Sequence, residues 1–327
     1  MAERIIGAKR SEQTLEPTAV AVQRVAVTDA HAGQRLDNFL LRLLKGAPKT
    51  LVYRVIRSGE VRVNGGRASA DRRLTEGDEV RVPPLRLAAE KPAAPPRDFT
   101  VLFEDEHLIA IDKPSGVAVH GGSGVSFGVI EQLRRARPLA RFLELVHRLD
   151  KETSGILLIA KKRSALLNLQ DQFRARDTGK TYAALVLGHW PAANKVIDVA
   201  LHKYLTAEGE RRVRAVGVDE GRRSISLVRV VSVFATCTLL DVTIKTGRTH
   251  QIRVHLSHAG HPIVGDDKYG DFAFNKRMAR GDVVPGLRFE RMFLHARSLS
   301  FDHPASGERV SLSADVPADC QTLLTRL

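Results

Sequence analysis

The chain has 327 residues, 43% hydrophobic and 27% charged, a mix typical of a globular protein with one large or two ordinary domains. Its longest apolar runs, such as residues 155–160, are too short to cross a bilayer, and the N-terminus lacks the apolar stretch of a signal peptide. Two cysteines are too few for a disulfide framework, which favours a reducing, cytoplasmic location. Secreted mini-proteins, membrane proteins and zinc-finger arrays are therefore excluded.

The charge balance points to a polyanionic partner. Lys and Arg number 51 against 37 Asp and Glu, which gives a net charge of +14 and a pI near 10.2. Phosphates attract such a surplus and release counterions when it neutralises them, so the balance favours a nucleic acid. A basic protein without such a partner remains the alternative.

A proline-rich segment divides the chain. Residues 91–97, Lys-Pro-Ala-Ala-Pro-Pro-Arg, predict an extended linker because their three prolines restrict the backbone. The residues before about position 20 show no hydrophobic periodicity, which is typical of a mobile tail. The expected organisation is a tail over residues 1–21, a small domain over 22–90, the linker over 91–97 and a large domain over 98–327.

Two short helices and two short strands are predicted in the small domain. Apolar residues follow helical spacing over 36–44 and again over 51–56, and Gly59 ends the second helix. An alternating strand over 61–63 runs into an Asn64-Gly65 turn, and a second strand covers 80–82. From Arg42 to Arg73 there are nine Lys or Arg residues against two acids. These form either an RNA-binding face or an ordinary solvated one.

Strand patterns outnumber helix patterns in the large domain. Apolar alternating runs predict strands over 101–103, 108–111, 143–146, 156–159, 182–187 and 239–244. Helices are predicted over 164–176 and from Thr249, an N-cap candidate, to Gly260, a C-cap candidate. Because strands and helices do not alternate regularly, the predicted fold class is α+β with a mixed, mostly antiparallel sheet.

The densest polar segment is His-Arg-Leu-Asp-Lys-Glu-Thr-Ser-Gly at residues 147–155, between two predicted strands. Catalytic groups are often held in such connections by a rigid scaffold. Asp150 could act as a nucleophile or general base, and Arg148 could approach a phosphate or a base. An ordinary polar turn stays open. So does a hydrolase triad of Ser154, His147 and Asp150, although no Gly-x-Ser-x-Gly elbow surrounds the serine.

A second candidate is Thr-Gly-Arg-Thr-His-Gln-Ile-Arg-Val-His at residues 246–255. Arg248 and Arg253 cannot both be core residues, so at least one is expected to meet an anion or a buried carboxylate. The histidines at 250, 255, 258 and 261 lack metal-ligand spacing and an accompanying thiolate or acidic cluster, so no metal site is predicted. The Gly-rich run 113–124 lacks the ending of a phosphate-binding loop and is interpreted as a flexible turn, without a nucleotide cofactor.

These motifs resemble two known families. Residues 33–40, 61–65 and 77–80 resemble the S4 RNA-binding domain, which implies an αL-type fold that binds structured RNA. Residues 147–155, supported in order by 112–116, 180–183, 247–253, 260–263 and 293–296, strongly resemble the RluA-type pseudouridine synthases of large-subunit ribosomal RNA. The leading S4 domain and residues 119–124 and 265–270 are similar to the C-type branch, which modifies several uridines of 23S rRNA. The match covers about residues 22–327.

The resemblance implies isomerisation of uridine to pseudouridine in 23S rRNA without a cofactor. The glycosidic bond breaks, and the detached uracil turns and rejoins through C5. Asp150 would be the catalytic aspartate and act at the C1′ side of the uridine. Tyr182 would stack on the target base, and Arg253 would pair with Asp150 and fix its rotamer.

The resemblance also implies contacts to the displaced nucleotide. Arg148 would help extrude the target base from the RNA stack, and Leu294 would supply an apolar wall. His147 and Arg248 are further substrate-binding candidates. The candidate RNA contacts in the small domain are Arg35, Lys49, Arg54, Arg57 and Arg62, and those in the large domain are Arg174, Lys180, Arg211 and Arg212.

The expected partner is 23S rRNA, free or in an assembling large subunit, bound by a monomer with no membrane contact and no nucleotide cofactor. The leading alternative is a non-catalytic rRNA-binding or ribosome-assembly protein on the same scaffold. The third class, a hydrolase that acts through Ser154 or the histidines, would be sensitive to metal removal or to covalent inhibitors.

Overall fold

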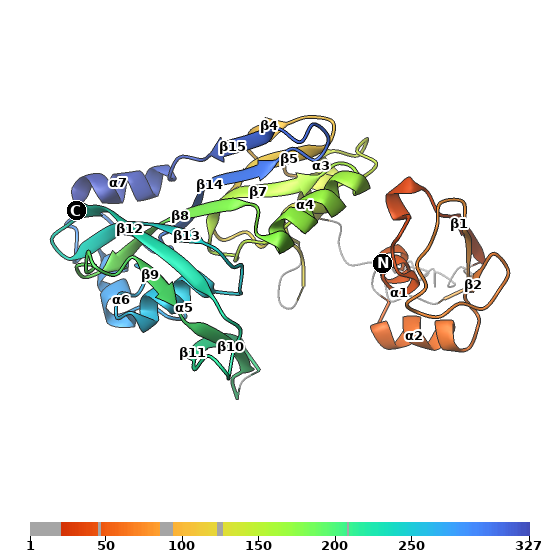
Figure 1. The fold of residues 1–327 in the computed structure, drawn as a ribbon, viewed down its shortest axis with the longest axis horizontal. Coiled ribbons are helices and arrows are strands. Elements are labelled where there is room, and N and C mark those ends of the chain that lie inside the picture. Colours follow the sequence, from red (N-terminus) through yellow and green to blue (C-terminus); the bar gives the residue numbers. More distant parts are fainter. Residues whose placement is uncertain (1–20, 45–46, 86–93, 123–126, 208) are drawn as a thin grey trace, which may run out of the picture. The chain divides into compact units, whose positions relative to one another are not determined.

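The computed structural model describes residues 21–44, 47–85, 94–122, 127–207 and 209–327 (Figure 1). Contacts divide the chain into two compact units, residues 1–93 and 94–327, each of which is described by itself below. The predicted tail lies outside the described residues except for residue 21, and the predicted linker is described only from residue 94. In the described ranges, no helix combines the length and apolar character needed to cross a membrane.

The small unit packs two helices against a three-stranded antiparallel sheet of order β1-β3-β2. Its elements are β1 (Gln23–Ala26), a 3₁₀ turn (Asp29–His31), α1 (Leu36–Leu43), α2 (Lys49–Arg57), β2 (Arg62–Val63) and β3 (Glu79–Val82). Both predicted helices are confirmed, because their apolar stripes close over one buried cluster that includes Leu40, Val52 and Val80. Asn64 and Gly65 both have positive φ, as a tight turn after β2 requires.

The large unit is built on a ten-stranded sheet with the path β4-β5-β7-β14-β8-β13-β12-β9, to which β6 and β15 add at β7 and β14. Strands β7 and β14 run parallel, and the other pairings of the described residues are antiparallel, which confirms the predicted mixed sheet. The strands are β4 (Val101–Glu104), β5 (Leu108–Lys113), β6 (Glu144–Leu145), β7 (Ser154–Ala160), β8 (Gly179–Leu187), β9 (Val196–Asp198), β10 (Ala200–Leu205), β11 (Arg211–Val216), β12 (Ile225–Val233), β13 (Cys237–Ile244), β14 (Leu294–Asp302) and β15 (Arg309–Ser313).

Strands β10 and β11 form a separate two-stranded ribbon that projects from the main sheet (Figure 1). The helices of the large unit are α3 (Val129–Ala136), α4 (Arg163–Ala175), α5 (Gln251–His258), α6 (Phe272–Arg280) and α7 (Ala318–Arg326). Helix α5 packs Ile252 and Leu256 on the apolar side chains of β8 and β13. The same face of β8 carries Tyr182, so the packing of α5 places the 246–255 segment beside that residue.

The predicted start of α5 is wrong. Thr249 is not the N-cap; the helix begins at Gln251, and His250 precedes it in the left-handed region at φ 52°. The Gln251 side-chain oxygen accepts hydrogen bonds from the Arg248 backbone N–H (3.1 Å) and the Thr246 hydroxyl (2.7 Å). This local loop replaces the usual threonine cap, which spacing alone does not reveal.

Candidate active site

Asp150 lies in the connection between β6 and β7 and lines a cleft of about 730 Å³ in the large unit. Its side chain is 28% exposed, so the carboxylate can be reached from solvent. The next residue, Lys151, is held by two hydrogen bonds. Its carbonyl accepts from the Lys113 ammonium (3.0 Å) and from the Gly116 N–H (3.0 Å). The backbone that carries Asp150 is therefore held by the end of β5 and the turn that follows it.

Lys113 is fully buried at the end of β5. Its ammonium also donates to the carbonyls of Pro114 (2.9 Å) and Val117 (2.8 Å), so three carbonyl oxygens replace its water shell. Burial lowers the pKa of Lys113 to about 7. The interpretation of residues 113–124 as a plain turn missed this role, because it depends on the distant Lys151.

Arg253 reaches Asp150 from α5, with 3.7 Å between Nη1 and Oδ2. Its closer partner is Asp266, which accepts from Nε (2.7 Å) and Nη2 (2.6 Å), and Asp267 accepts from Nη2 at 2.9 Å. The side chains of Arg253 and Asp266 are 3% and 1% exposed. Burial opposes the charge on Asp266, but the hydrogen bonds from Arg253 hold the pKa of Asp266 below its usual range.

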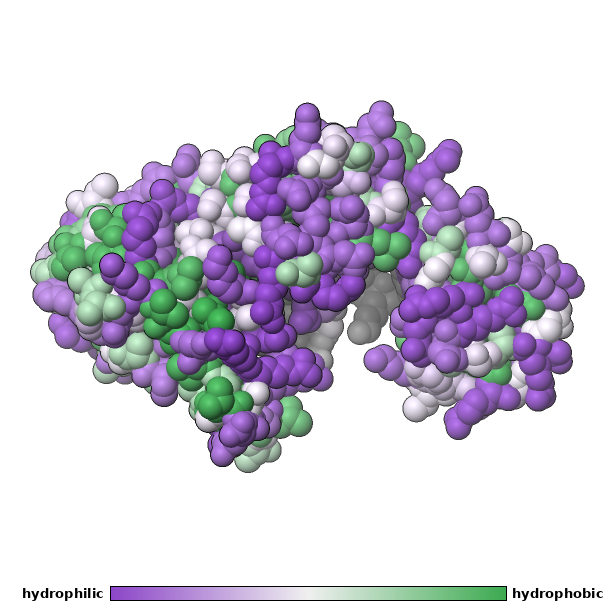
Figure 2. Space-filling view, in the orientation of Figure 1, coloured by the Kyte–Doolittle hydropathy of each residue, from purple (hydrophilic) through white to green (hydrophobic). Residues whose placement is uncertain are grey.

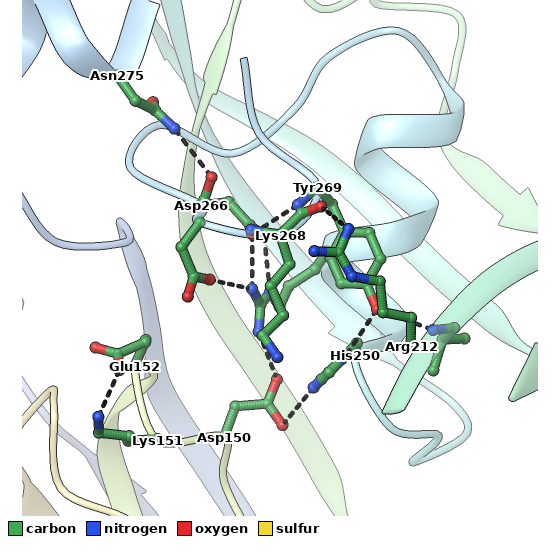
Figure 3. A network of polar contacts seen from close by, with 12 residues as sticks. Asp150, Lys151, Glu152, Arg212, His250, Asp266, Lys268, Tyr269 and Asn275 are labelled. Carbon is green, nitrogen blue, oxygen red and sulfur yellow. Dashed lines mark hydrogen bonds and ion pairs between the residues drawn. The ribbon is translucent and has the colours of Figure 1, made fainter. Parts of the chain in front are cut away.

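The expected pairing of Arg253 with Asp150 is thus one arm of a larger network, part of which Figure 3 shows. Asp266 also accepts the backbone N–H groups of Lys268 (2.8 Å) and Tyr269 (3.0 Å). Its backbone carbonyl accepts from the Asn275 side chain at 2.9 Å. Sequence reasoning singled out residues 265–270 for their resemblance alone and gave Asp266 no role.

Tyr182 on β8 and Leu294 on β14 line the same cleft as Asp150. Together with Ile244 and Ile252 they provide apolar surface on which a base can lie. Burial, with a contribution from the Asp150 charge, raises the pKa of Tyr182 well above its usual range. Tyr182 is therefore a neutral phenol at physiological pH, with its proton in place.

A basic group surrounds the cleft. The cationic residues that line it are Arg148, Lys151, Arg174, Arg176, Lys180, Lys245, Arg248 and Arg253. Arg148 is exposed, whereas Lys180 is buried with its ammonium 5.1 Å from the centre of the Phe173 ring. The Nε atom of Arg248 is buried and has no hydrogen-bond partner among the residues that the structure describes. Apolar surface within a cationic rim suits an unstacked base attached to a phosphate backbone.

Comparisons with known proteins identify this arrangement. The family described as RNA pseudouridylate synthase matches residues 107–258, and the S4 domain matches residues 34–80. The ribosomal large subunit pseudouridine synthase C of Haemophilus influenzae is 48% identical over 94% of this chain and 95% of its own length. The Escherichia coli protein of that name is 47% identical over 94% of this chain and 97% of its own.

The chain belongs to the ribosomal large subunit pseudouridine synthase family. It is accordingly an isomerase that makes pseudouridine in RNA. The solved structure of human RNA pseudouridylate synthase domain containing 4 superposes with a TM-score of 0.58 at 29% identity, over 70% of this chain and 92% of that one. Human RNA pseudouridylate synthase domain containing 1 gives 0.53 at 27% identity, over 67% and 83%.

His147 of the synthase lines the cleft, but its ring is also built into the fold. The ring stacks on Phe173 with centroids 4.8 Å apart, and its Nε2 accepts the Leu158 backbone N–H at 3.1 Å. Burial lowers the pKa of His147 to about 3. The neutral ring therefore supports the backbone on which Arg148 and Asp150 lie.

The hydrolase alternative is wrong for this geometry. The Ser154 hydroxyl contacts His295 Nδ1 (2.9 Å) and accepts from Arg291 (2.6 Å), rather than meeting His147. Both Ser154 and His295 are fully buried, so no substrate can reach the serine. The His295 Nε2 lies 3.2 Å from the Ala314 carbonyl, which completes a structural chain of hydrogen bonds.

The other histidines named in the sequence also make contacts within the fold. His255 contacts the Ser226 hydroxyl (3.0 Å) and the Val199 carbonyl (3.1 Å), and His261 contacts the Leu187 carbonyl (3.0 Å). Over the part of the chain that the structure describes, no group of three or more His, Cys, Asp or Glu side chains could hold a metal ion.

The RNA-contact candidates differ in their surroundings. On the small unit, Lys49, Arg54 and Arg57 are exposed on α2, Arg62 is half-buried, and Arg35 is exposed but paired with buried Asp37. Hydrophilic residues predominate on the visible face of this unit in Figure 2.

On the large unit, Arg174 and Lys180 line the cleft, whereas Arg211 and Arg212 lie on the ribbon strand β11, outside it. Arg211 is exposed. Arg212 is occupied within the protein, because it donates to Glu210 (2.9 Å) and to the Lys268 carbonyl (3.3 Å). This arginine ties the ribbon to the loop that carries Asp266.

Glycine is required for steric reasons at position 155, the last residue of the 147–155 motif. Gly155 has φ 108°, and a Cβ there would lie 2.4 Å from the Ala296 carbonyl oxygen on β14. We expect Gly155→Ala to lower the free energy of unfolding by at least about 2 kcal/mol, because backbone must move to admit the methyl group. Gly247→Ala is the matched control, since a Cβ there meets nothing within 4 Å. Urea unfolding measures both, and equal losses would contradict this account.

Proposed function

We propose that this synthase converts uridines of 23S ribosomal RNA to pseudouridine, with Asp150 as the catalytic residue. The observation that carries the proposal is the composition of the cleft, which joins a reachable carboxylate, an apolar wall with Tyr182 and Leu294, and a cationic rim. The relatives named for the ribosomal large subunit support this choice of RNA.

The reaction is an isomerisation whose atoms balance within the uridine. The bond from N1 of the base to C1′ breaks, a bond from C5 to C1′ forms, the C5 proton leaves and N1 gains a proton. Asp150 acts at the C1′ side, where one carboxylate can stabilise or trap the sugar cation. Arg253 orients that carboxylate from 3.7 Å, and Tyr182 and Leu294 hold the detached base while it turns.

The target base must leave its stack before Asp150 can reach the sugar, at a cost of a few kcal/mol. Arg148 is adjacent in sequence to the Leu149-Asp150 pair and exposed at the cleft, where it can occupy the space that the base vacates. Arg174, Lys180 and Arg248 line the same cleft and can bind flanking phosphates, which offsets the cost of unstacking.

We also propose a setting for the reaction. The small unit, with its S4 match, binds structured rRNA through the exposed cations of α2. We place the enzyme in the cytoplasm as a monomer that acts on 23S rRNA, free or in an assembling large subunit. The boundaries at residues 22–90 and 98–327 are part of this proposal.

The test is tritium release from unmodified 23S rRNA that carries tritium at uridine C5. We expect release proportional to the pseudouridine formed, because the C5 proton is lost when C5 bonds to C1′. The positions of the new pseudouridines are then mapped by chemical sequencing. Tight binding of this RNA without release would overturn the proposal that 23S rRNA is the substrate.

The role of α2 in RNA binding gives a separate expectation. A triple variant with Lys49, Arg54 and Arg57 changed to Ala should reduce the magnitude of the negative slope of log K against log salt by about 2–3, since each lost phosphate contact reduces it by about 0.7–0.9. Arg24→Ala is the control, because Arg24 pairs with Glu79 at 2.8 Å in the same unit. A triple variant with the wild-type slope would remove α2 from the RNA interface.

A further inference from the structure

His250 combines two features that the proposed mechanism does not use. Its backbone lies in the left-handed region (φ 52°, ψ 21°), which costs a residue other than Gly about 1–2 kcal/mol. Its ring enters the catalytic cleft, and Nε2 lies 3.9 Å from Oδ1 of Asp150 (Figure 3). Strain of this kind persists only where surrounding contacts hold the residue in place, and it is concentrated at functional sites.

A hydrogen-bond chain sets the tautomer of the His250 ring. The Val213 backbone N–H on β11 donates to the Tyr269 hydroxyl at 3.0 Å. The hydroxyl oxygen lies 2.8 Å from Nδ1 of His250. We assign the donor role in this contact to Tyr269, because its oxygen already accepts the Val213 N–H. A neutral ring that accepts at Nδ1 carries its own proton on Nε2, the nitrogen that faces Asp150.

Burial keeps the His250 ring neutral, and charged groups of both signs face it. Asp150 faces the ring from the β6–β7 connection, and Arg253 faces it from α5. Lys268 and Asp266 face it from the loop between α5 and α6. Burial lowers the pKa of His250, and Arg253 and Lys268 lower it further against the opposing effect of the two carboxylates. His250 is thus an uncharged donor beside Asp150, whereas Arg253 is a charged one.

We propose that His250 is a positioning residue for Asp150. The two donors address different atoms of the carboxylate, His250 Nε2 at Oδ1 and Arg253 Nη1 at Oδ2, so together they fix its plane. The separations of 3.9 Å and 3.7 Å shorten to hydrogen bonds when RNA excludes water from the cleft. A neutral second donor orients the carboxylate without adding another positive charge. This inference rests on the proposed role of Asp150.

Two substitutions of His250 distinguish a role as hydrogen-bond donor to Asp150 from a role in folding. Asn tolerates the left-handed region better than most residues, but its short amide does not reach the position of Nε2. Gln extends the amide by one methylene and can present an N–H near that position. We expect His250→Asn to lower the single-turnover rate of tritium release by about 10–100-fold and His250→Gln to recover most of it. The RNA Kd and the urea midpoint should stay near wild type for both.

Tyr269→Phe tests the tautomer. Without the hydroxyl, the neutral ring can carry its proton on Nδ1 instead of Nε2, so it no longer always donates toward Asp150. The single-turnover rate of Tyr269→Phe should therefore fall several-fold, while the RNA Kd stays near wild type. The Phe ring still fills the space beside Arg253.

Equal losses in His250→Asn and His250→Gln, losses confined to RNA affinity, or a wild-type rate for Tyr269→Phe would each overturn the inference. Its failure is distinguishable from failure of the proposed function. An active Asp150→Asn variant would remove Asp150 from catalysis whatever His250 does. An inactive Asp150→Asn variant beside a fully active His250→Asn variant would overturn only the role of His250.

Discussion

Asp150→Asn is expected to lower tritium release from C5-labelled 23S rRNA by about 10³-fold or more, with the RNA Kd within about twofold of wild type. Asn keeps the size of the side chain and removes the charge that the proposed mechanism places at C1′. Folding should survive, because Arg253 keeps its bonds to Asp266 and Asp267 and is not left as an unpaired buried charge. The backbone bond from Thr153 to the carbonyl of residue 150 is also kept.

The matched control is Asp267→Asn. Asp267 also accepts from Arg253, but its side chain is 61% exposed and its carboxylate does not line the cleft. We expect that variant to keep its rate within a few-fold of wild type in the same single-turnover assay. If Asp150→Asn and Asp267→Asn release tritium equally, the carboxylate of Asp150 has no special part in the reaction.

The second large effect is on stability. Asp266→Ala should lower the free energy of unfolding by about 3–5 kcal/mol, because it leaves the guanidinium of Arg253 buried without its main partner. The N–H groups of Lys268 and Tyr269 lose their acceptor in the same step. Urea unfolding measures the loss, and release of tritium should fall as well, since Arg253 is no longer held toward Asp150.

A double variant distinguishes the effect of the unpaired Arg253 charge from the effect of lost packing. Adding Arg253→Met to Asp266→Ala removes the unpaired cation, so part of the lost stability should return even though a second side chain has changed. Asp267→Ala is the exposed comparison, with an expected loss of less than about 1 kcal/mol. A loss in Asp266→Ala no larger than that of Asp267→Ala would contradict the structural role given to the buried pair.

Helical periodicity predicted α1, α2 and α4 to within about two residues, because each has one apolar face that packs on a single cluster or sheet face. Alternation likewise found β5, β7, β8 and β13. The start of α5 was missed, since the bonds that Gln251 makes to Arg248 and Thr246 outweigh the capping rule. Alternation also found β2, β3, β4 and β6, whereas β1, β9, β10, β11, β12, β14 and β15 were not predicted.

Some residues of the candidate site could likewise be predicted from the sequence and others could not. Asp150, Tyr182, Arg253 and Leu294 were named together, and the structure brings them to one cleft. Lys113, Asp266 and Tyr269 acquire their roles only through partners in other segments. A buried lysine under a carbonyl cluster and a charge pair between α5 and a loop have no local pattern, so periodicity and motif spacing could not reveal them.

The parallel pairing of β7 with β14 has a consequence for how the enzyme matures. It joins Ser154 to His295, so the sheet beneath the cleft links positions 141 residues apart. Pairing over such a separation forms late in folding, because a long loop must close first. During synthesis, Asp150 and the strand β7 that follows it are made well before Leu294. A nascent chain therefore carries the proposed catalytic carboxylate before the apolar wall to which Leu294 contributes, and we expect it to become competent only after β14 has been made and has paired with β7.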